Sequence, residues 1–441
     1  MKCKPLNSIW TVSLLAALAI PVQLSAQEQP TSHIPDRYTL TDIGPVGPVL
    51  GQAYFITNND LISGAAAAPD GSMHATLWKK GVEIDMTKGG GFGGPNSLSF
   101  GGNRKGQSVG GAETSNSDPD GEDFCGFAAM GIPSSGTCLP FVWQHGAMAP
   151  LPTLGGNNGI ANQINSRGVV AGQAETVIRD KDCPGPQLFH FKPVVWEQGQ
   201  IRRLRTVGGD PDGVALAINE AGDVAGASGT CSTFSPTLLI SLLPHHALLW
   251  ENRKPTDLGT LGGQFGNVAL NLNNKGQVVG ASDLSGDATS HAFLWTRETG
   301  MQDLGTLPGD VISAAIGIND RGEIVGVSLD QYFNLHAYIL RHGQMTDLND
   351  LITGDSPLLL LLPCSINARG EITGLAVDTR TGEPHGFLAT PVQSAGGSAK
   401  AAPAVQRSGD GIRAALSGNV RQLLQQRLPF GRFMAWPQGP Q

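Results

Sequence analysis

The segment 116–123 contains the residues whose types and spacing best suit metal chemistry. Asn116, Asp118, Asp120 and Asp123 follow one another at short intervals around a Gly, and calcium loops bring such oxygen side chains to one cation. The last position of a calcium loop carries a bidentate Glu, but the corresponding residue here is Phe127. The sequence therefore predicts either a partial, structural calcium site or a plain acidic turn, and it predicts no other cofactor.

Four cysteines are candidates for disulfides, because an exported chain meets an oxidising compartment. Cys125 and Cys138 flank a short loop, and a bond between them would contribute about 3 kcal/mol. Cys183 and Cys231 lie in corresponding segments of neighbouring repeats, where a bond would join the two units. Cys364 is expected to be the remaining thiol, because it stands where other repeats carry a buried aliphatic residue.

Histidine and asparagine each recur at one position of a repeated unit. Imidazoles are common metal ligands, but equivalent positions on separate units of a ring cannot converge on one ion. A structural role is therefore expected, in which each His hydrogen-bonds a hairpin turn. The His positions are His74, His246, His291, His336 and His385, and the Asn positions are Asn165, Asn219, Asn273, Asn319 and Asn367.

Motifs of known catalytic chemistry are missing from the sequence. It contains no Gly-x-Ser-x-Gly elbow, no His-Glu-x-x-His helix, no phosphate loop and no dinucleotide fingerprint. The acids Asp257, Asp303 and Asp347 follow the repeat and are expected to be structural. This favours a protein that is not an enzyme. The alternative is a site assembled from single residues of separate repeats.

The elements that position these residues form a repeat. Each copy places two short blocks rich in β-branched residues on either side of Asn-x-x-Gly, which is typical of a β-hairpin. This marker occurs at Asn103 and at the five Asn positions given above, and a degenerate copy occupies residues 57–60. His-Ala-Phe-Leu-Trp (291–295) predicts a third strand, and Met-x-Asp-Leu-Gly-Thr-Leu (301–307) predicts a fourth.

Seven such units predict an all-β fold, a seven-bladed β-propeller of four-stranded antiparallel blades. The alternative, a β-solenoid, is disfavoured because its coils are shorter than these units. Residues 38–44 resemble a fourth strand standing alone, whereas the last unit stops after its third strand at 385–388. The N-terminal strand is therefore expected to complete the last blade and close the ring without an exposed edge.

Three repeats carry long insertions between their second and third strands, at 112–137, 174–191 and 227–245. Equivalent loops emerge on one face, so these insertions are expected to build a raised rim over adjacent blades. Insertions on one face of a repeat protein commonly mark its binding surface. The alternative is sequence drift in tolerant loops.

The sequence resembles the bacterial extracellular HAF-repeat family, named after its His-Ala-Phe motif. The resemblance rests on 291–295, on the Asp-Leu-Gly-Thr-Leu blocks that begin at Asp257 and Asp303, and on the Asn-x-x-Gly-x-Val-Val-Gly hairpins, and it covers roughly 38–390. Units two and three depart from it, because Leu139 and Lys192 replace the His. The resemblance implies an exported, propeller-like protein and no established activity.

The N-terminus reads as a signal peptide (1–26) with two Lys, an apolar stretch and a small-residue cleavage site, followed by a leader (27–37). The propeller is expected over 38–392, a flexible linker over 393–409, and a tail with one short amphipathic helix over 410–441. No segment is long enough to span a bilayer. The acidic balance, a formal net charge of −8, disfavours a nucleic-acid partner.

These features lead to three hypotheses for a secreted, periplasmic or cell-surface protein. The first is a non-catalytic binding or scaffold module that recognises a glycan, peptide or surface protein through the inserted loops. The second is an extracellular hydrolase or lyase with its site at the mouth of the propeller channel. The third is a structural protein of the cell envelope, held by its C-terminal tail.

Overall fold

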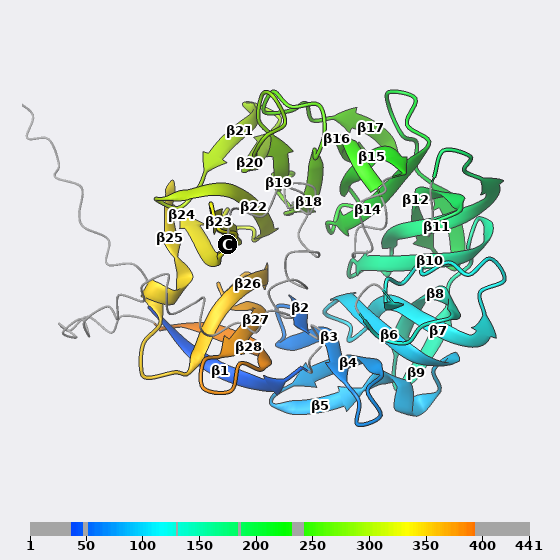
Figure 1. Cartoon of the computed structure of the whole chain (residues 1–441), viewed down its shortest axis with the longest axis horizontal. Coiled ribbons are helices and arrows are strands. Elements are labelled where there is room, and N and C mark those ends of the chain that lie inside the picture. The colour runs from blue at the N-terminus through cyan, green and yellow to red at the C-terminus, as the bar shows by residue number, and fades with distance from the viewer. Residues whose placement is uncertain (1–36, 47–51, 129–130, 184–186, 232–241, 393–441) are drawn as a thin grey trace, which may run out of the picture. The chain divides into compact units, whose positions relative to one another are not determined.

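The computed structural model describes residues 37–46, 52–128, 131–183, 187–231 and 242–392. These residues form seven four-stranded antiparallel sheets arranged as blades around one axis (Figure 1). The fold is therefore the seven-bladed β-propeller that the repeat predicts. The expected signal peptide, linker and tail helix lie outside the described residues, as does all of the leader except Arg37.

Each blade uses four consecutive strands, except the last, whose fourth strand comes from the N-terminus. In blade order the strands are β2(Gln52–Ile56) β3(Leu61–Ala67) β4(Met73–Lys79) β5(Val82–Asp85); β6(Gly93–Gly102) β7(Ser108–Ser117) β8(Gly136–Gln144) β9(Ala147–Pro150); β10(Gly155–Ile164) β11(Val170–Arg179) β12(Phe189–Glu197) β13(Gln200–Arg203); β14(Asp212–Ile218) β15(Val224–Cys231) β16(Leu242–Glu251) β17(Lys254–Asp257); β18(Val268–Leu272) β19(Val278–Asp283) β20(Ser290–Thr296) β21(Gly300–Gly305); β22(Asp310–Ile318) β23(Ile324–Asp330) β24(Leu335–Arg341) β25(Gln344–Asp347); and β26(Leu358–Ile366) β27(Ile372–Asp378) β28(Pro384–Val392) with β1(Arg37–Pro45).

The ring closes as the sequence predicts. Strand β1 pairs antiparallel with β28, with Thr39 opposite Thr390 and Asp42 opposite Phe387. Tyr38, on the same strand, is fully buried. The two ends of the repeat region thus share one sheet, which leaves no unpaired edge where the chain begins and ends its ring.

The Asn-x-x-Gly turns have the local chemistry expected of them. In the fifth blade the Asn273 Oδ1 accepts the N–H groups of Lys275 and Gln277 (3.0 and 3.1 Å). Gly276 then takes a left-handed φ of 73°, a region that glycine enters without strain. In the degenerate first copy, Asp60 occupies that position with a φ of 64°.

Every innermost strand contains a β-bulge, whose extra residue lies two positions before the last residue of the strand. These residues are Tyr54, Phe100, Asn162, Leu216, Leu270, Ile316 and Cys364. Cys364 thus occupies the position of Leu270 and Ile316, as the sequence predicts, but this position is half-buried and not buried. It belongs to neither disulfide, and its thiol donates to the Leu362 carbonyl (3.6 Å).

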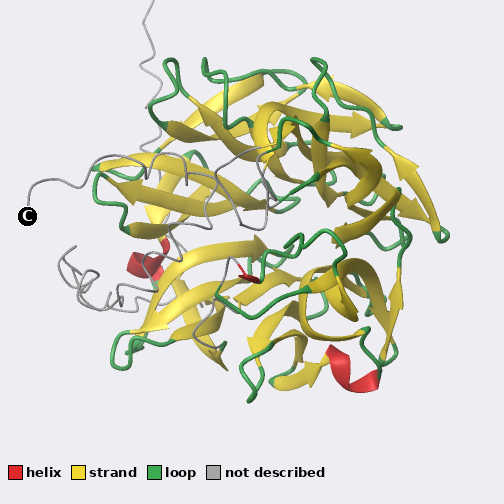
Figure 2. Cartoon of the chain, turned by 45° about the vertical axis from the view of Figure 1, so that its right-hand side comes forward, coloured by secondary structure: helices red, strands yellow, loops and turns green. Residues whose placement is uncertain are grey.

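Strands dominate the described residues, which contain only short 3-10 turns beside them (Figure 2). Turn η1(Met86–Gly89) is capped by Asp85, and turn η3(Leu348–Leu351) is capped by Asp347. Asp347 therefore has the structural role expected of the repeated acids. Among the described residues, no helix is long and apolar enough to cross a membrane.

Candidate functional site

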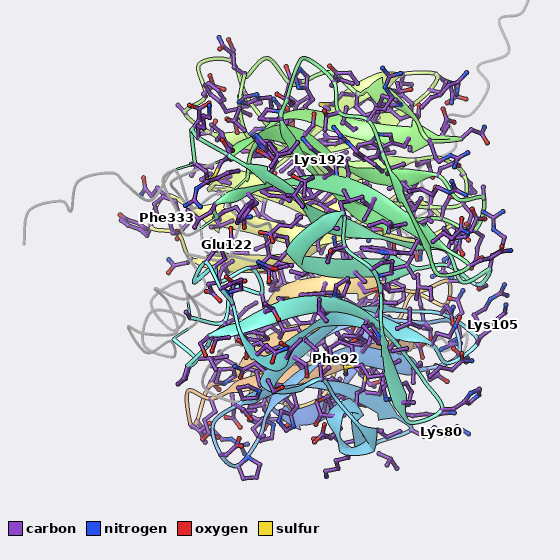
Figure 3. The ribbon with its side chains drawn as sticks, turned by 90° about the vertical axis from the view of Figure 1, so that its right-hand side faces the viewer. Lys80, Phe92, Lys105, Glu122, Lys192 and Phe333 are labelled. Carbon is purple, nitrogen blue, oxygen red and sulfur yellow. A yellow bond between two sulfur atoms is a disulfide. The ribbon has the colours of Figure 1, made fainter. Side chains whose placement is uncertain are left out.

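The two ends of the propeller present different kinds of connection. Because the strands of each blade are antiparallel, the turns after the first and third strands lie on one face, which we call the hairpin face. The connections after the second strands, including the insertions, lie on the opposite face, which we call the insert face. Figure 3 shows Lys80 and Lys105 on the hairpin side, and Glu122 and Phe333 on the insert side.

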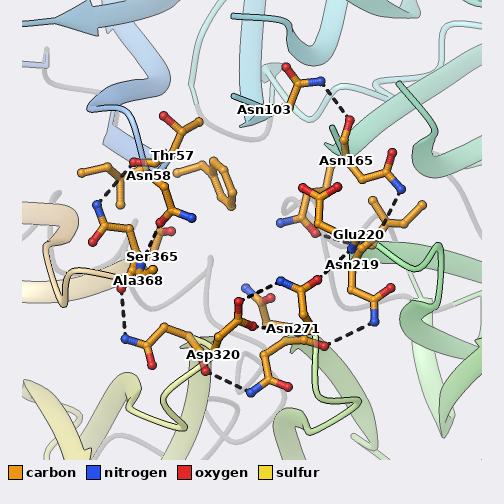
Figure 4. A pocket seen from close by; sticks show the side chains of 18 of the residues that line it. Thr57, Asn58, Asn103, Asn165, Asn219, Glu220, Asn271, Asp320, Ser365 and Ala368 are labelled. Carbon is orange, nitrogen blue, oxygen red and sulfur yellow. Dashed lines mark hydrogen bonds between the residues drawn. The ribbon is translucent and has the colours of Figure 1, made fainter. Parts of the chain in front are cut away.

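On the hairpin face the repeated Asn side chains form a ring of hydrogen bonds. Each Asn donates from Nδ2 to the backbone carbonyl of the equivalent residue in the next blade (Figure 4). The donors are Asn103, Asn165, Asn219, Asn273, Asn319 and Asn367, with distances from 2.9 to 3.3 Å, and the last bond ends on the Thr57 carbonyl. Between the first two blades, Asn59 donates instead to the Arg104 carbonyl (3.3 Å).

This ring surrounds a cavity of about 270 Å³ at the hairpin end of the channel. Its acidic lining residues, Glu220 and Asp320, accept backbone N–H groups from Ser166 (3.1 Å) and Asn274 (2.9 Å) in the neighbouring blades. No His or Cys occurs among the described residues that line it. The Ser166 hydroxyl also donates to the Glu220 carboxylate (2.7 Å). The lining can therefore bind polar groups, and it contains one serine hydroxyl paired with a carboxylate.

On the insert face the insertions of blades 2–4 are joined to one another. The Glu122 carboxylate in the blade-2 insertion accepts the N–H groups of Leu188 and Phe189 in the blade-3 insertion (2.5 and 3.2 Å). A disulfide between Cys183 and Cys231 then joins the blade-3 insertion to blade 4. Covalent and hydrogen bonds thus link three adjacent blades on this side.

The second disulfide, Cys125–Cys138, holds the blade-2 insertion against its own blade. Both predicted pairings are confirmed. Phe124, Phe127 and Ile132 of this insertion are buried in an apolar cluster that also contains strand residues from all seven blades. Phe127 is 0% exposed. The blade-2 insertion is therefore packed, through these apolar side chains, against strands of the whole ring.

A group of buried carboxyl groups lies beneath the blade-2 and blade-3 insertions. Glu175 is fully buried and accepts the amides of Asn158 (3.1 Å) and Gln187 (2.7 Å). Burial, together with the Glu122 charge and a hydrogen bond to the Glu122 carboxylate, raises the pKa of Glu175 to about 8. Burial also raises the pKa of Glu122. Two carboxyl groups that share a hydrogen bond hold one proton between them.

The residues of the predicted calcium segment are engaged in protein contacts. Asp118 Oδ1 accepts the N–H groups of Asp120 and Glu122 (2.9 and 3.1 Å), and its Oδ2 accepts the Asn158 amide (2.9 Å). Asp120 lies 3.8 Å from Arg179. Among the described residues, Asp118, Asp120 and Asp123 do not form a set with oxygens all within 4.8 Å of one another. Calcium binding at Asn116–Asp123 stays a prediction.

The repeated histidines bind carboxylates, and the expectation that they contact hairpin turns is wrong. Each His opens a third strand, so it lies at the insert end of its blade, whereas the hairpin turns lie at the opposite end. The ring Nδ1 atoms lie 2.8 to 3.0 Å from one acid each. The pairs are His74–Asp85, His246–Asp210, His291–Asp303, His336–Asp310 and His385–Asp42.

Blade 3 replaces this pair with a larger group that the sequence analysis missed. His190 Nδ1 lies 3.1 Å from Asp212 of β14 and 3.5 Å from Asp180 of the insertion. Lys192, which stands at the repeated His position, is also buried. Burial raises the pKa of Asp212 to about 6 and lowers the pKa of Lys192. The missing His in unit three was the signal that could have indicated a different site here.

Comparisons with known proteins support the fold and nothing finer. No family model matches the chain, and no curated protein matches its sequence. Among solved structures, virginiamycin B lyase from Staphylococcus aureus is similar at 9% identity and a TM-score of 0.42, over 80% of this chain and all of that one.

Two other similar structures belong to proteins of different kinds. The WD40 β-propeller domain of Doa1 has 13% identity and a TM-score of 0.39, over 79% of this chain and 96% of that one. Acylaminoacyl peptidase from Pyrococcus horikoshii has 11% identity and a TM-score of 0.39, over 72% of this chain but only 48% of the peptidase.

Proposed function

We propose that this protein is an exported binding or scaffold module of the HAF-repeat type, which recognises its ligand through the insert face of blades 2–4. The observation that carries the proposal is the linkage of the inserts, through Glu122 and through the Cys183–Cys231 disulfide. Loops that are fixed before binding lose less conformational entropy when they bind. A rigid scaffold with variable, tied loops is the usual arrangement of a recognition surface.

The exposed side chains of this face favour a peptide or protein ligand over a glycan. Val177 and Ile178, at the outer end of β11, are 69% and 60% exposed. Arg179 beside them lies over the Phe189 ring, 5.8 Å from its centroid. Exposed apolar side chains that are scattered singly are ordinary, whereas adjacent ones mark an interaction site. Apolar side chains with an Arg beside them are typical of the surfaces that bind a polypeptide partner.

Export is part of the same proposal. The N-terminal segment 1–26 has the pattern of a signal peptide, and two disulfides are compatible with an oxidising compartment. Fusion of residues 1–26 to a reporter enzyme that is active only outside the cytoplasm tests this directly. Loss of reporter activity when Lys2 and Lys4 are replaced by Glu is expected. Reporter protein retained in the cytoplasm with the native segment would contradict export.

A catalytic alternative, an extracellular hydrolase or lyase at the channel mouth, has weaker support. The hairpin-end cavity is lined by amides and by two acids that already accept neighbouring N–H groups. At the insert end, Phe124 and Phe127 belong to the apolar cluster described above. General acid–base catalysis needs a titratable group within hydrogen-bond reach of the substrate. In the hairpin-end cavity, the Glu220 carboxylate is already engaged by the Ser166 hydroxyl (2.7 Å) and by the Ser166 N–H (3.1 Å).

A binding screen on peptide and glycan arrays tests the proposal with a matched pair of variants. The double variant Val177→Ser/Ile178→Ser removes the exposed aliphatic groups of the insert face. Val82→Ser removes an equally exposed residue, at 60%, from the start of β5 on the hairpin side. We expect the double variant to weaken binding at least tenfold and Val82→Ser to leave it unchanged.

Unchanged binding by the double variant, or equal loss in both variants, would contradict the assignment to the insert face. Incubation of the same arrays followed by mass spectrometry separates binding from catalysis. Array ligands converted to hydrolysis products would favour a hydrolase, and ligands converted to elimination products would favour a lyase.

A further inference from the structure

The group formed by Asp180, His190 and Asp212 has the spacing of a metal-binding site. One donor atom from each residue lies within 4.8 Å of the others. The His190 Nδ1 lies 3.1 Å from an Asp212 oxygen and 3.5 Å from an Asp180 oxygen. Two ligands at the 2.0–2.2 Å bond lengths of a tetrahedral zinc ion lie roughly 3.3–3.6 Å apart. The imidazole and the two carboxylates are therefore already near the separations that such an ion requires.

Asp212 supplies a second, independent observation. The residue as a whole is 0% exposed, and its Oδ1 accepts the Phe191 N–H (3.0 Å) besides facing His190. Its Oδ2 is buried and has no hydrogen-bond partner among the described residues. A buried carboxylate oxygen without a partner is costly, so it normally belongs to an ion pair, a proton or a metal ion.

We propose that Asp180, His190 and Asp212 bind a divalent transition-metal ion of the Zn²⁺ class. One nitrogen and two carboxylate oxygens suit Zn²⁺ or Mn²⁺ better than Ca²⁺, which prefers oxygen ligands only. The ion would join the blade-3 insertion, through Asp180, to the first strand of blade 4, through Asp212. This site does not depend on the proposed binding function.

The surroundings leave the ion accessible from one side. The His190 side chain is 20% exposed, whereas the Asp180 and Asp212 side chains are only 5% and 1% exposed. Three protein ligands with one open side leave a position for water or for a ligand group. Buried Lys192 lies near both acids and balances part of their charge when the ion is absent.

The other His–Asp contacts of the propeller show why this group is different. The His336 Nδ1 in blade 6 contacts one acid, Asp310, whose two carboxylate oxygens lie 2.9 to 3.0 Å away. Among the described residues, Asp180, His190 and Asp212 are the only group of a His and two acids whose donor atoms all lie within 4.8 Å of one another. One of these acids, Asp212, comes from the next blade. His336 therefore provides a matched control for His190.

Isothermal titration of the metal-free mature protein with Zn²⁺ and Mn²⁺ tests the proposal. The preparation should carry no polyhistidine tag and should be kept oxidised, because the disulfide sulfurs of Cys183 and Cys231 lie beside Asp180. We expect one equivalent of metal to bind. Asp212→Asn and His190→Gln should each weaken binding at least tenfold, and His336→Gln should leave it unchanged.

Two further readouts complete the test. Binding of Co²⁺ should give the visible absorption of a four-coordinate site, and Asp212→Asn should abolish it. Asp118→Asn separates this site from a calcium site at 116–123, because it should leave the zinc isotherm unchanged. The proposal is overturned if the folded wild type binds no stoichiometric Zn²⁺ or Mn²⁺, or if the isotherm is insensitive to Asp212→Asn and His190→Gln.

Discussion

On the hairpin face, six consecutive blades carry the same buried Asn. The insert face of blades 2–4 instead carries buried polar residues that do not recur from blade to blade, namely Glu122, Glu175, Asp180, Lys192 and Asp212. On the hairpin face, the Asn side chain of each of these blades donates to the backbone carbonyl of the equivalent residue in the next blade. On the insert face, Glu175 shares a proton with Glu122, and Asp212 keeps an oxygen without a partner among the described residues.

The difference follows from symmetry. A residue that repeats in a ring meets the same neighbour in every blade, so one hydrogen bond can be repeated around the ring and closed. An insertion that occurs in one blade has no such guaranteed neighbour, and its polar groups depend on the particular path of that loop. Groups that are not satisfied within the repeat are available for a ligand, a proton or an ion.

The largest expected effect concerns the covalent link of the insert face. The Cys183–Cys231 bond closes a loop of 48 residues, so removing it should lower the free energy of unfolding by about 4 kcal/mol. The double variant Cys183→Ser/Cys231→Ser, measured by denaturant unfolding, checks this value. Cys125→Ser/Cys138→Ser opens a loop of 13 residues and should cost about 3 kcal/mol.

Amide hydrogen exchange of the Cys183→Ser/Cys231→Ser variant would show which parts of the propeller lose stability. Amides of β11 and β15 near the insertions should exchange faster, while those of the Asn turns should stay protected. Faster exchange at the turns as well would show that the two faces are not independent.

The second effect concerns the Asn ring. Asn273→Ala removes three bonds to Lys275 and Gln277 and one to the Asn319 carbonyl, so it should lower the free energy of unfolding by about 3 kcal/mol. Asn116, an exposed Asn on the insert face, is the matched control, and Asn116→Ala should change stability by less than about 0.5 kcal/mol. If thermal unfolding shows a similar small loss of stability in both variants, the hypothesis that the Asn ring holds the blades together is wrong.

The smallest effect concerns the buried acid pair and its pH dependence. The folded-state pKa of Glu175 is about 8, above its ordinary value near 4.5. The folded protein therefore binds more protons than the unfolded chain between these values, and stability should fall as the pH rises through that window. Glu175→Gln should remove this fall, so at pH 9 the variant should be more stable than the wild type by about 1.4 kcal/mol or more.

Thermal unfolding at pH 5 and pH 9 measures this difference. Glu371, which accepts the Asn367 amide on the hairpin face (2.6 Å), is the control, and Glu371→Gln should give no gain at pH 9. A loss of stability in Glu175→Gln that is equal at both pH values would mean that Glu175 is ionised in the folded protein.

Much of the fold could be predicted because its signals are local. A turn such as 273–276 depends on contacts within four residues, so the types of Asn273 and Gly276 determine it. The pairing of β1 with β28 joins distant residues, yet it could be predicted because one strand was missing from the last repeat and one was left over at the start. The Cys125–Cys138 disulfide could be predicted because both cysteines flank one loop, and the Cys183–Cys231 disulfide because its cysteines lie in corresponding loops of neighbouring repeats.

The candidate site could be predicted only in outline. The insertions indicated blades 2–4, but no sequence pattern connects Glu122 with Leu188 or Asp180 with Asp212. The repeated His residues were assigned to the wrong end of their blades, because the third strand begins at the insert end. His190 was overlooked, since it lies two positions before Lys192 and outside the repeated pattern.

The repeat, its strands and turns, and the closure of the ring can all be predicted from the amino-acid sequence, since each depends on residues that are near in the chain or on a count of strands. The side chains that meet between blades become known only from the folded structure. Those contacts depend on how neighbouring blades are staggered around the axis and on where each insertion runs, and neither is encoded in any local pattern. The Asn ring and the Asp180–His190–Asp212 group both arise at that level.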